Sequence, residues 1–430
     1  MARAFRHNAA MNRSTPSTHL SSDKGHSVVA APVSGHPLAE LIAHEIRERG
    51  GWMGFERFME LALYAPGLGY YSGGRRVLGQ RPQDGSDFVT APELTPLFGE
   101  VLARQVLQAL DATGTDEVWE FGAGTGALAE QLLGELGDRI QRYVIVDLSG
   151  SLRDRQHQRL IKAHPSLVHK VIWADSLPEA MSGVIVGNEV LDAMPVHLLS
   201  WDGARWQERG VALAPATTSS TAGTSSTATT ATQAALHPHP AFTWADRPAP
   251  EGVRPPTEHP DSAYPPGTVT ETHGQAEAFV TTLAQRMTRG AAFFLDYGFP
   301  EAEYYLPQRH GGTLMCHHAH TADPDPLAMV GDKDITAHVN FTGIALTGQD
   351  AGWEVLGYCS QGRFLSNCGL GEALARTGQA SNAADIQSRV ALQMLVAEHE
   401  MGELFKVIGF VKGPWFEAIG FAHGDRTHTL

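Results

Sequence analysis

The sequence predicts an α/β protein with a mostly parallel sheet and helices on both faces. Short apolar runs alternate with amphipathic stretches over residues 118–187, and the first run ends in a glycine-rich turn that opens a helix. Alternating strands and helices need a parallel sheet with right-handed crossovers. A chain of 430 residues with 42% hydrophobic residues is long enough for one enlarged α/β domain or for two domains.

The elements follow in order along the chain. The strands are expected where apolar runs are short, and the helices where apolar residues recur every three or four positions. The first half gives strand 118–121, helix 127–136, strand 143–147, helix 151–163, strand 169–174 and strand 184–187. The second half gives helix 275–289, strand 291–295, and two late antiparallel strands at 353–358 and 404–411 around helix 383–399.

The remaining segments set the predicted domain boundaries. Residues 1–35 are interpreted as a disordered N-terminus, and residues 36–115 as a helical cap or lid. The α/β domain is assigned to 116–211 and 271–415. Residues 212–270 are rich in Ala, Thr, Ser and Pro, so we expect a largely disordered insertion that cannot bury enough surface to offset its ordering entropy.

The glycine-rich turn indicates a nucleoside ligand. Glycines at Gly122, Gly124 and Gly126 let the main chain approach a ligand, and the following helix directs its first N–H groups at it. Asp147 ends the next strand, where a carboxylate can accept both hydroxyls of a ribose. Glu120, two positions before the first glycine, completes an E-x-G-x-G-x-G pattern common in methyltransferases.

Two cofactor classes compete for this pattern, a dinucleotide and S-adenosylmethionine. Gly122, Gly124 and Ala127 also satisfy a relaxed dinucleotide fingerprint. Polar residues after the next strands favour the methyl donor: Asp175 and Ser176 are placed to meet an adenine amino group, although a turn cap explains them too. Asn188, which follows strand 184–187, would close the donor site.

Carboxylates after strand 184–187 are the candidate catalytic residues. Glu189 and Asp192 are expected at the edge of the pocket, where they would orient the acceptor; a solvated loop is the alternative. If the acceptor is arginine, a carboxylate pair can hold the protonated guanidinium bidentately. The segment from Asp87 to Glu93 is expected either to fold over the same pocket as a lid or to start a capped helix.

Several segments together resemble one family of S-adenosylmethionine-dependent methyltransferases, that of the mitochondrial complex I assembly factor and its bacterial relatives. The matching segments are 63–71, 86–100, 188–197, 295–298, 334–339 and 401–407. The resemblance implies a Rossmann-like class I fold with a mostly parallel seven-stranded sheet, and methylation of protein arginine. Asn340, where the family more often has an acidic residue, departs from its pattern.

Composition restricts the partners. With 47 acidic and 32 basic residues the net charge is −15, which repels nucleic acid and favours a basic, arginine-bearing protein. No run approaches the roughly 18 apolar residues of a membrane helix, so no membrane insertion is expected. A bacterial cytoplasmic location is favoured, and the Arg- and Ser-rich start leaves the mitochondrial matrix as the alternative. A homodimer is left open.

No metal is expected. The three cysteines form no C-x-x-C pair, and in the run Cys316 to His320 neighbouring side chains of an extended segment point to opposite faces. His338 is interpreted as a structural histidine. Two alternatives to the enzyme remain at this point: a scaffold protein that binds the cofactor without turnover, and an NAD(P)-dependent oxidoreductase.

Overall fold

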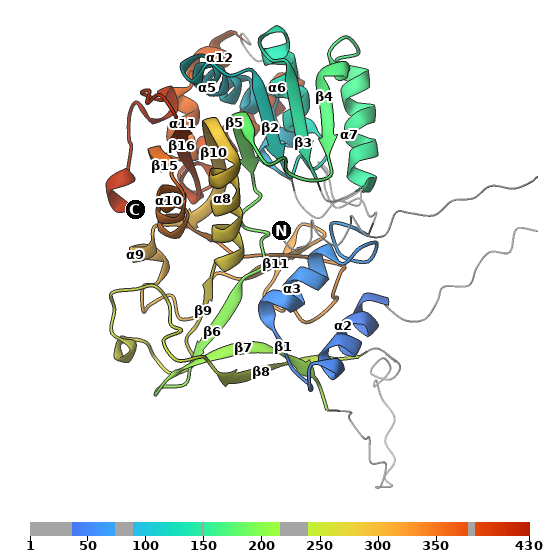
Figure 1. The fold of residues 1–430 in the computed structure, drawn as a ribbon, viewed down its shortest axis with the longest axis vertical. Coiled ribbons are helices and arrows are strands. Elements are labelled where there is room, and N and C mark those ends of the chain that lie inside the picture. The colour runs from blue at the N-terminus through green and yellow to red at the C-terminus, as the bar shows by residue number, and fades with distance from the viewer. Residues whose placement is uncertain (1–36, 74–88, 148–149, 216–239, 377–382) are drawn as a thin grey trace, which may run out of the picture.

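The structure is a computed structural model that describes residues 37–73, 89–147, 150–215, 240–376 and 383–430. It has two parts (Figure 1). The α/β domain carries the large sheet, and a second part lies beyond the carboxyl ends of its parallel strands. We call this second part the antiparallel module; it consists of residues 37–64, 197–213, 242–272 and 315–336.

The large sheet has a parallel centre and an antiparallel edge. Its order is β15-β16-β10-β5-β2-β3-β4, with parallel pairing from β10 to β4 and with β16 antiparallel to both of its neighbours. A short eighth strand, β14, pairs in parallel with β10, so the sheet has one strand more than predicted. The strands are β2 (Glu117–Phe121), β3 (Arg142–Val146), β4 (Val171–Ala174), β5 (Met181–Asn188), β10 (Met287–Phe299), β14 (Val339–Asn340), β15 (Glu354–Ser360) and β16 (Phe405–Lys412).

Helices cover both faces of this sheet because the strand residues alternate between two cores. In β5, Val184 and Val186 belong to one core cluster and Ile185 to the other. The first cluster is covered by α5 (Leu97–Thr113), α6 (Ala127–Leu136), α7 (Gly150–Ala163), α11 (Gln361–Asn367), α12 (Leu370–Arg376) and α13 (Ala383–Val396). The second is covered by α8 (Gly274–Arg286) and α10 (Phe341–Asp350). The prediction of helix 127–136 is confirmed with the same bounds.

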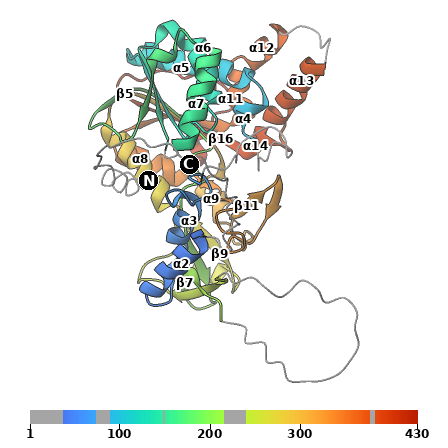
Figure 2. The same cartoon turned by 90° about the vertical axis from the view of Figure 1, so that its right-hand side faces the viewer.

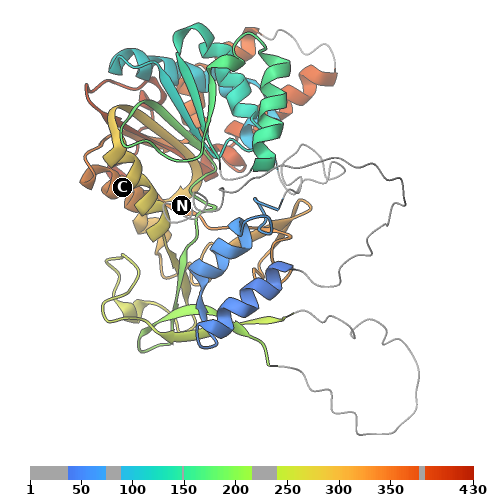
Figure 3. The same cartoon turned by 45° about the vertical axis from the view of Figure 1, so that its right-hand side comes forward.

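The antiparallel module has a core of its own. Helices α2 (Pro37–Glu48) and α3 (Phe55–Tyr64) pack on a five-stranded sheet, and buried side chains such as Phe58, Leu198 and Ile335 join them. Figures 2 and 3 show these two helices beside that sheet, apart from the large sheet. The strands are β1 (Met53–Gly54), β6 (His197–Trp201), β7 (Trp206–Leu213), β8 (Phe242–Pro248) and β9 (Val269–Thr272), with a small sheet of β11 (Met315–His318), β12 (Thr321–Asp323) and β13 (Asp334–Thr336).

The expectation of a largely disordered insertion at 212–270 needs correction. Strand β8 pairs along its whole length with β7, and β9 pairs with β6. The physical reason is aromatic burial: Trp244 and Phe242 contact Phe55 and Phe58 of α3, with ring centroids 5.4 and 5.7 Å apart. The Thr-rich part, residues 216–239, lies outside the described residues.

The predicted domain boundaries also change, because each element belongs to the part of the molecule in whose core its apolar side chains are buried. Of the expected N-terminal cap, α5 packs into the core of the α/β domain, and only α2, α3 and β1 belong to the antiparallel module. Strands β6, β7, β11 and β13, assigned to the α/β domain from sequence, belong to the module core instead. At the other end the α/β domain extends past residue 415, because Phe421 is buried in its core.

Candidate active site

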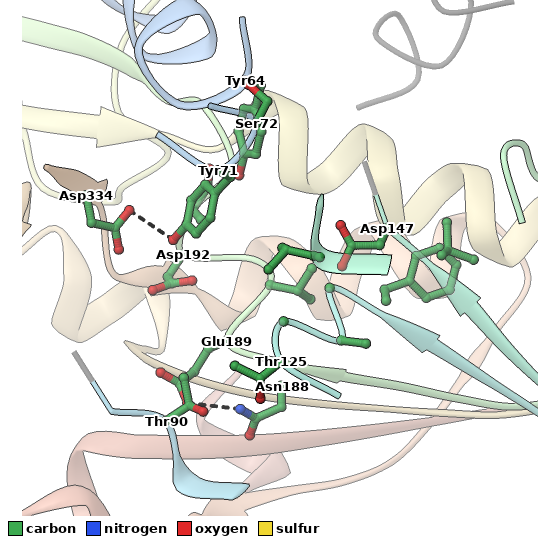
Figure 4. A pocket seen from close by; sticks show the side chains of 18 of the residues that line it. Tyr64, Tyr71, Ser72, Thr90, Thr125, Asp147, Asn188, Glu189, Asp192 and Asp334 are labelled. Carbon is green, nitrogen blue, oxygen red and sulfur yellow. Dashed lines mark hydrogen bonds between the residues drawn. The ribbon is translucent and has the colours of Figure 1, made fainter. Parts of the chain in front are cut away.

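A cavity of ≈850 Å³ lies where the carboxyl ends of β2, β3 and β5 face the antiparallel module. Ligands of open α/β sheets bind at this edge, where successive loops converge. Both parts of the molecule supply its walls (Figure 4). In the close-up, Asp147 lies on one side, and Asp192, Asp334 and Tyr71 lie on the other.

The glycine turn after β2 forms the floor of the Asp147 side. Gly122 and Gly124 line the cavity with φ of +66° and +53°, a backbone region that other L-residues enter only under strain. Thr125 lines it as well, and α6 begins directly after the turn. The N-terminus of this helix therefore supplies a partial positive charge beside the cavity.

Asp147 is fixed by an amide from α7. Gln156 donates from Nε2 to Asp147 Oδ2 at 2.8 Å and to the carbonyl oxygen of Gly124 at 2.9 Å, so the carboxylate and the glycine turn are tied together. Glu120 lines the same side and accepts a hydrogen bond from the Tyr143 hydroxyl at 2.7 Å. Burial, with the nearby charge of Asp147, raises the pKa of Glu120 to about 8.

Asn188, the last residue of β5, and Glu189, which follows it, both line the cavity. Asn188 donates from Nδ2 to Glu189 Oε1 at 2.9 Å, while its own Oδ1 is buried with no hydrogen-bond partner among the described residues. Glu189 has a φ of +52°, unusual for a residue with a side chain. Burial and the charge of Asp192 raise the pKa of Glu189 to about 8.

Asp192 is 5% exposed and has one oxygen to spare. Its Oδ1 has no partner among the described residues, while the hydroxyl of Tyr297 hydrogen-bonds the carboxylate. Burial raises the pKa of Asp192 to about 6. Behind it, Asp296 Oδ2 accepts the backbone N–H groups of Leu191 and Asp192 at 2.9 and 3.2 Å, which holds this loop in place.

The antiparallel module and the loop after α3 complete the wall. Tyr64 donates to the carbonyl oxygen of Ala193 at 2.8 Å, and Tyr71 donates to Asp334 Oδ1 at 2.9 Å. The rings of Tyr64 and Tyr71 stack with centroids 5.7 Å apart. Burial raises the pKa of both phenols well above its usual value, so both hydroxyls stay protonated near neutral pH.

The charge of this cavity is negative. Five carboxyl groups line it, besides Glu60 at the edge: Glu120, Asp147, Glu189, Asp192 and Asp334. Among the described lining residues the Arg and Lys side chains are Arg49 and Arg57, and Glu45 pairs with both at 2.7 and 2.9 Å. Of these carboxylates, Asp192 has a buried oxygen, Oδ1, with no hydrogen-bond partner among the described residues, so this oxygen can accept a cationic ligand.

The segment before α5 touches both sides of the cavity. Val89, Thr90 and Pro92 line it, beside the short helix α4 (Ala91–Leu94). The backbone N–H of Ala91 hydrogen-bonds Glu189, and Glu93 accepts hydrogen bonds from the Thr125 hydroxyl and from Arg159 Nη1, the latter at 2.7 Å. The lid predicted for Asp87 to Glu93 is therefore placed at the cavity from residue 89 on, and Asp87 itself lies outside the described residues.

Three predicted cofactor residues do not line the cavity. The side chain of Asp175 is 87% exposed and pairs with Arg153 Nη1 at 2.5 Å, and Ser176 is exposed beside it. Gly126 caps α6 with a φ of +81°, and a Cβ there would lie 3.3 Å from Gln156, so this glycine allows α7 to pack closely. Their structural contacts account for these three residues here, and their predicted contacts with the cofactor stay predictions.

Sequence reasoning missed the tyrosines of the cavity and its third carboxylate beside Glu189 and Asp192. Tyr64, Tyr71, Tyr297 and Asp334 all lie in segments that resemble the methyltransferase family, but those segments gave no reason for a role. His317 also lines the cavity, opposite Asp334 in the register of β11 and β13. Only the pairing of these strands brings them together.

The histidine- and cysteine-rich run has structural contacts. Cys316 is buried in the module core, and His318 Nδ1 bonds the carbonyl oxygen of Asp332 at 2.9 Å. No cluster of three or more His, Cys, Asp or Glu side chains in the described part of the chain could hold a metal ion. The carbonyl oxygen of His338 bonds His273 Nε2 at 2.8 Å.

Fold and cavity together define the class of protein. It is an α/β protein with a ligand cavity at the carboxyl ends of its parallel strands, where a glycine turn and the carboxylate of Asp147 meet. Residues 101–359 match a family described as S-adenosyl-L-methionine-dependent methyltransferase, and the chain belongs to this family. Of the two cofactor classes predicted from sequence, S-adenosyl-L-methionine is therefore the cofactor.

Named relatives include mitochondrial proteins of animals. The chain is similar to the protein arginine methyltransferase NDUFAF7 homolog, mitochondrial, of Caenorhabditis elegans, at 25% identity over 88% of this chain and 87% of that protein. It is also similar to human protein arginine methyltransferase NDUFAF7, mitochondrial, at 24% identity over 86% and 82% of the two chains. The predicted family resemblance is confirmed.

Two solved structures from Burkholderia thailandensis share the fold. One, described as a methyl transferase bound to S-adenosyl-homocysteine, has 48% identity and a TM-score of 0.81, covering 92% of this chain and 96% of that chain. The other has 46% identity and a TM-score of 0.78 over the same shares. None of the helices in the described ranges has the length and apolar character that a bilayer crossing requires.

Proposed function

We propose that this methyltransferase transfers a methyl group from S-adenosyl-L-methionine to an arginine side chain of a protein. The observation that carries the proposal is the anionic compartment. Glu189 is partly buried and Asp192 is buried in it, Asp192 Oδ1 has no partner among the described residues, and the described Arg side chains that line the cavity pair with Glu45 instead. A guanidinium ion supplies the donors that these oxygens lack.

The donor half of the cavity fits the cofactor. Gly122 and Gly124 line this half with positive φ just before α6, where their backbone would meet the methionine end, and Asp147 is held where it can accept the ribose hydroxyls. Asn188 Oδ1, buried and without a partner in the described residues, is available for a donor group of the cofactor. Glu120 also lines this half of the cavity. The cofactor supplies a methyl group on a positively charged sulfur.

The acceptor half would position the guanidinium for this transfer. Asp192 and Glu189 accept N–H groups from its two edges, so that one nitrogen is directed towards the donor half. A methylated guanidinium nitrogen must lose a proton, and an ionised Glu189 or Asp192 can take it up before solvent does. Fixing two reactants in this way can contribute roughly 7–11 kcal/mol to rate acceleration.

Methylation of peptides tests this function. The purified chain, with labelled S-adenosyl-L-methionine, would be offered basic peptides containing arginine and matched peptides in which lysine or norleucine replaces it. Label is expected on the arginine side chain only, located by mass spectrometry. Transfer to lysine but not to arginine would contradict arginine specificity.

Glu189→Gln separates catalysis from cofactor binding. Turnover is expected to fall by two orders of magnitude or more, roughly the scale of a lost acid–base or orienting group, while affinity for S-adenosyl-homocysteine stays within about twofold by calorimetry. Asp147→Ala is the opposite control and should lose affinity for the cofactor. Turnover retained in Glu189→Gln would remove Glu189 from this role.

The scaffold alternative makes a different prediction. A chain that binds S-adenosyl-homocysteine but transfers no label to any arginine-bearing protein of its own cells would act as an assembly factor rather than an enzyme. The location of the chain and a homodimeric state stay predictions.

A further inference from the structure

The antiparallel module contributes a further carboxylate to the cavity. It lies outside the loop after β5, residues 189–195, which carries Glu189 and Asp192 and is called the catalytic loop below. Asp334 is the first residue of β13 and is 2% exposed. Its Oδ1 accepts hydrogen bonds from the hydroxyl of Tyr71 and from the backbone N–H of Ile335, both at 2.9 Å. The carboxylate is therefore held in one orientation at the cavity wall.

A backbone hydrogen bond places β13 against the catalytic loop. Ala337, which follows β13, donates its N–H to the carbonyl oxygen of Asp192 at 3.0 Å. Burial raises the pKa of the Tyr71 phenol well above its usual value, and the negative charges of Asp334 and Asp192 add to this rise. Figure 4 shows the Tyr71 hydroxyl between the two.

Flat aromatic faces complete this compartment. Tyr64 and Tyr71 stack at an interplanar angle of 19°, and Tyr64 is fixed to the catalytic loop through its bond to Ala193. A planar delocalised cation can stack on such a ring while its edges reach carboxylates on either side, whereas a compact, strongly hydrated ammonium cannot use both contacts. The arrangement fits guanidinium better than ammonium.

We propose that Asp334, oriented by Tyr71, is an acceptor-binding residue that selects a guanidinium group, and that the acceptor site is thus shared between the α/β domain and the antiparallel module. This inference rests on the proposed function, because it takes the acceptor to be an arginine. It goes further by assigning part of the specificity to a residue outside the catalytic loop.

Peptide binding to the protein saturated with S-adenosyl-homocysteine tests the inference without requiring turnover. The probes are the pentapeptide Gly-Gly-Arg-Gly-Gly and its lysine and norleucine counterparts, titrated by calorimetry or by competition. Asp334→Asn removes the charge but keeps the shape. Asp332→Asn is the matched control, because it makes the same charge change two positions away at a residue that does not line the cavity.

The expected result is a selective loss. Asp334→Asn should lower the affinity for the arginine peptide by about tenfold or more, the scale of a charge-assisted contact. It should also reduce the ratio of the affinities for the arginine and lysine peptides. The Asp334→Asn variant should keep the wild-type affinity for S-adenosyl-homocysteine. The Asp332→Asn variant should bind both this ligand and the arginine peptide as the wild type does. Equal weakening in both variants would indicate a general charge effect and overturn the inference, as would unchanged binding in Asp334→Asn.

Two further outcomes separate this inference from the proposed function. If the wild-type protein binds the arginine peptide no better than the norleucine peptide, the arginine acceptor itself is wrong and both proposals fall. If the Asp334→Asn variant no longer binds S-adenosyl-homocysteine either, Tyr71→Phe takes its place as the test variant. It keeps the aromatic ring and removes only the hydroxyl that orients Asp334. Weakened arginine binding in Tyr71→Phe supports the inference, and unchanged binding overturns it.

Discussion

At the scale of single residues, the cavity is governed by carboxyl groups that share a small buried space. Each one makes its neighbours harder to ionise, because burial and like charge both favour the protonated form. Burial raises the pKa of Asp192 to about 6. Burial together with the charge of Asp192 raises the pKa of Glu189 to about 8, and the same two causes raise the pKa of Asp296. A cationic acceptor reverses this effect, since it stabilises the ionised forms.

A pH dependence follows, and its sign is fixed by the direction of these shifts. A carboxyl group with a raised pKa becomes anionic only at higher pH, so kcat/KM for an arginine peptide should rise between pH 6 and 8 and level off above. Initial rates in constant-ionic-strength buffers measure it. Variants of Glu189 would be too slow for a comparison of rates, so binding of the arginine peptide provides the control. A bound cation favours the ionised carboxylates, so peptide binding should release protons. Calorimetry detects this release, because the binding enthalpy then depends on the buffer. A flat profile with no proton release would contradict the ionisation scheme.

The glycine turn gives a second prediction at this scale. Gly126→Ala places a side chain at a φ of +81° and within 3.3 Å of Gln156, so the free energy of unfolding should fall by about 1–2 kcal/mol. Denaturant unfolding measures the change. Gly371→Ala, in α12 with open space around it, is the matched control and should leave stability equal or slightly higher. Equal stabilities for the two variants would show that the backbone strain is relieved elsewhere.

At the scale of elements, α4 links the two halves of the cavity. Its Ala91 N–H holds Glu189, and its Glu93 contacts Thr125 of the glycine turn together with Arg159 of α7. The segment therefore connects the turn that faces the cofactor with the carboxylate proposed to face the acceptor. The motif was visible in the sequence, but its contacts were not.

Glu93→Gln tests this link. Loss of the charge that pairs with Arg159 should loosen Thr125 and weaken S-adenosyl-homocysteine binding by about three- to tenfold, the range of one ordinary hydrogen bond, as measured by calorimetry. Glu130→Gln is the control, because Glu130 pairs with Arg159 Nε at 2.5 Å, whereas the Thr125 hydroxyl donates to Glu93. An equal effect of both variants would mean that Arg159 matters for stability rather than Glu93 for the cofactor site.

At the scale of the whole molecule, the antiparallel module supplies part of the cavity lining, including the wall proposed to bind the acceptor. The module core is separate from the two cores of the large sheet, but Tyr64 and the Ala337 N–H bond directly to the catalytic loop. The chain enters and leaves the module several times between elements of the α/β domain. A division by sequence order therefore cannot separate the two parts.

Deletions test which part of residues 212–270, the segment predicted to be an insertion, contributes to stability. Leu213 of β7 and Phe242 of β8 are directly paired, and the N–H of Ala214 bonds the carbonyl oxygen of Ala241 at 2.8 Å, so a short turn can join the two strands. Replacing residues 216–239 by a four-residue Gly/Asn turn should leave cofactor affinity and thermal stability unchanged. Replacing 216–248, which also removes β8, should lower stability, because Trp244 and Phe242 then leave α3 exposed. A large loss in the first variant would show a role for 216–239.

The sequence by itself determined the parallel strands, the glycine turn and the central polar residues of the cavity. These features are local: the alternation of β5 and the step from its last apolar residue to Asn188 and Glu189 can be seen in a single stretch of chain. The tertiary structure alone decided that Asp175 pairs with Arg153, that β8 pairs with β7, and that Tyr71 bonds Asp334. The physical reason is that burial and charge pairing depend on which distant elements pack together, and local spacing carries no information about those partners.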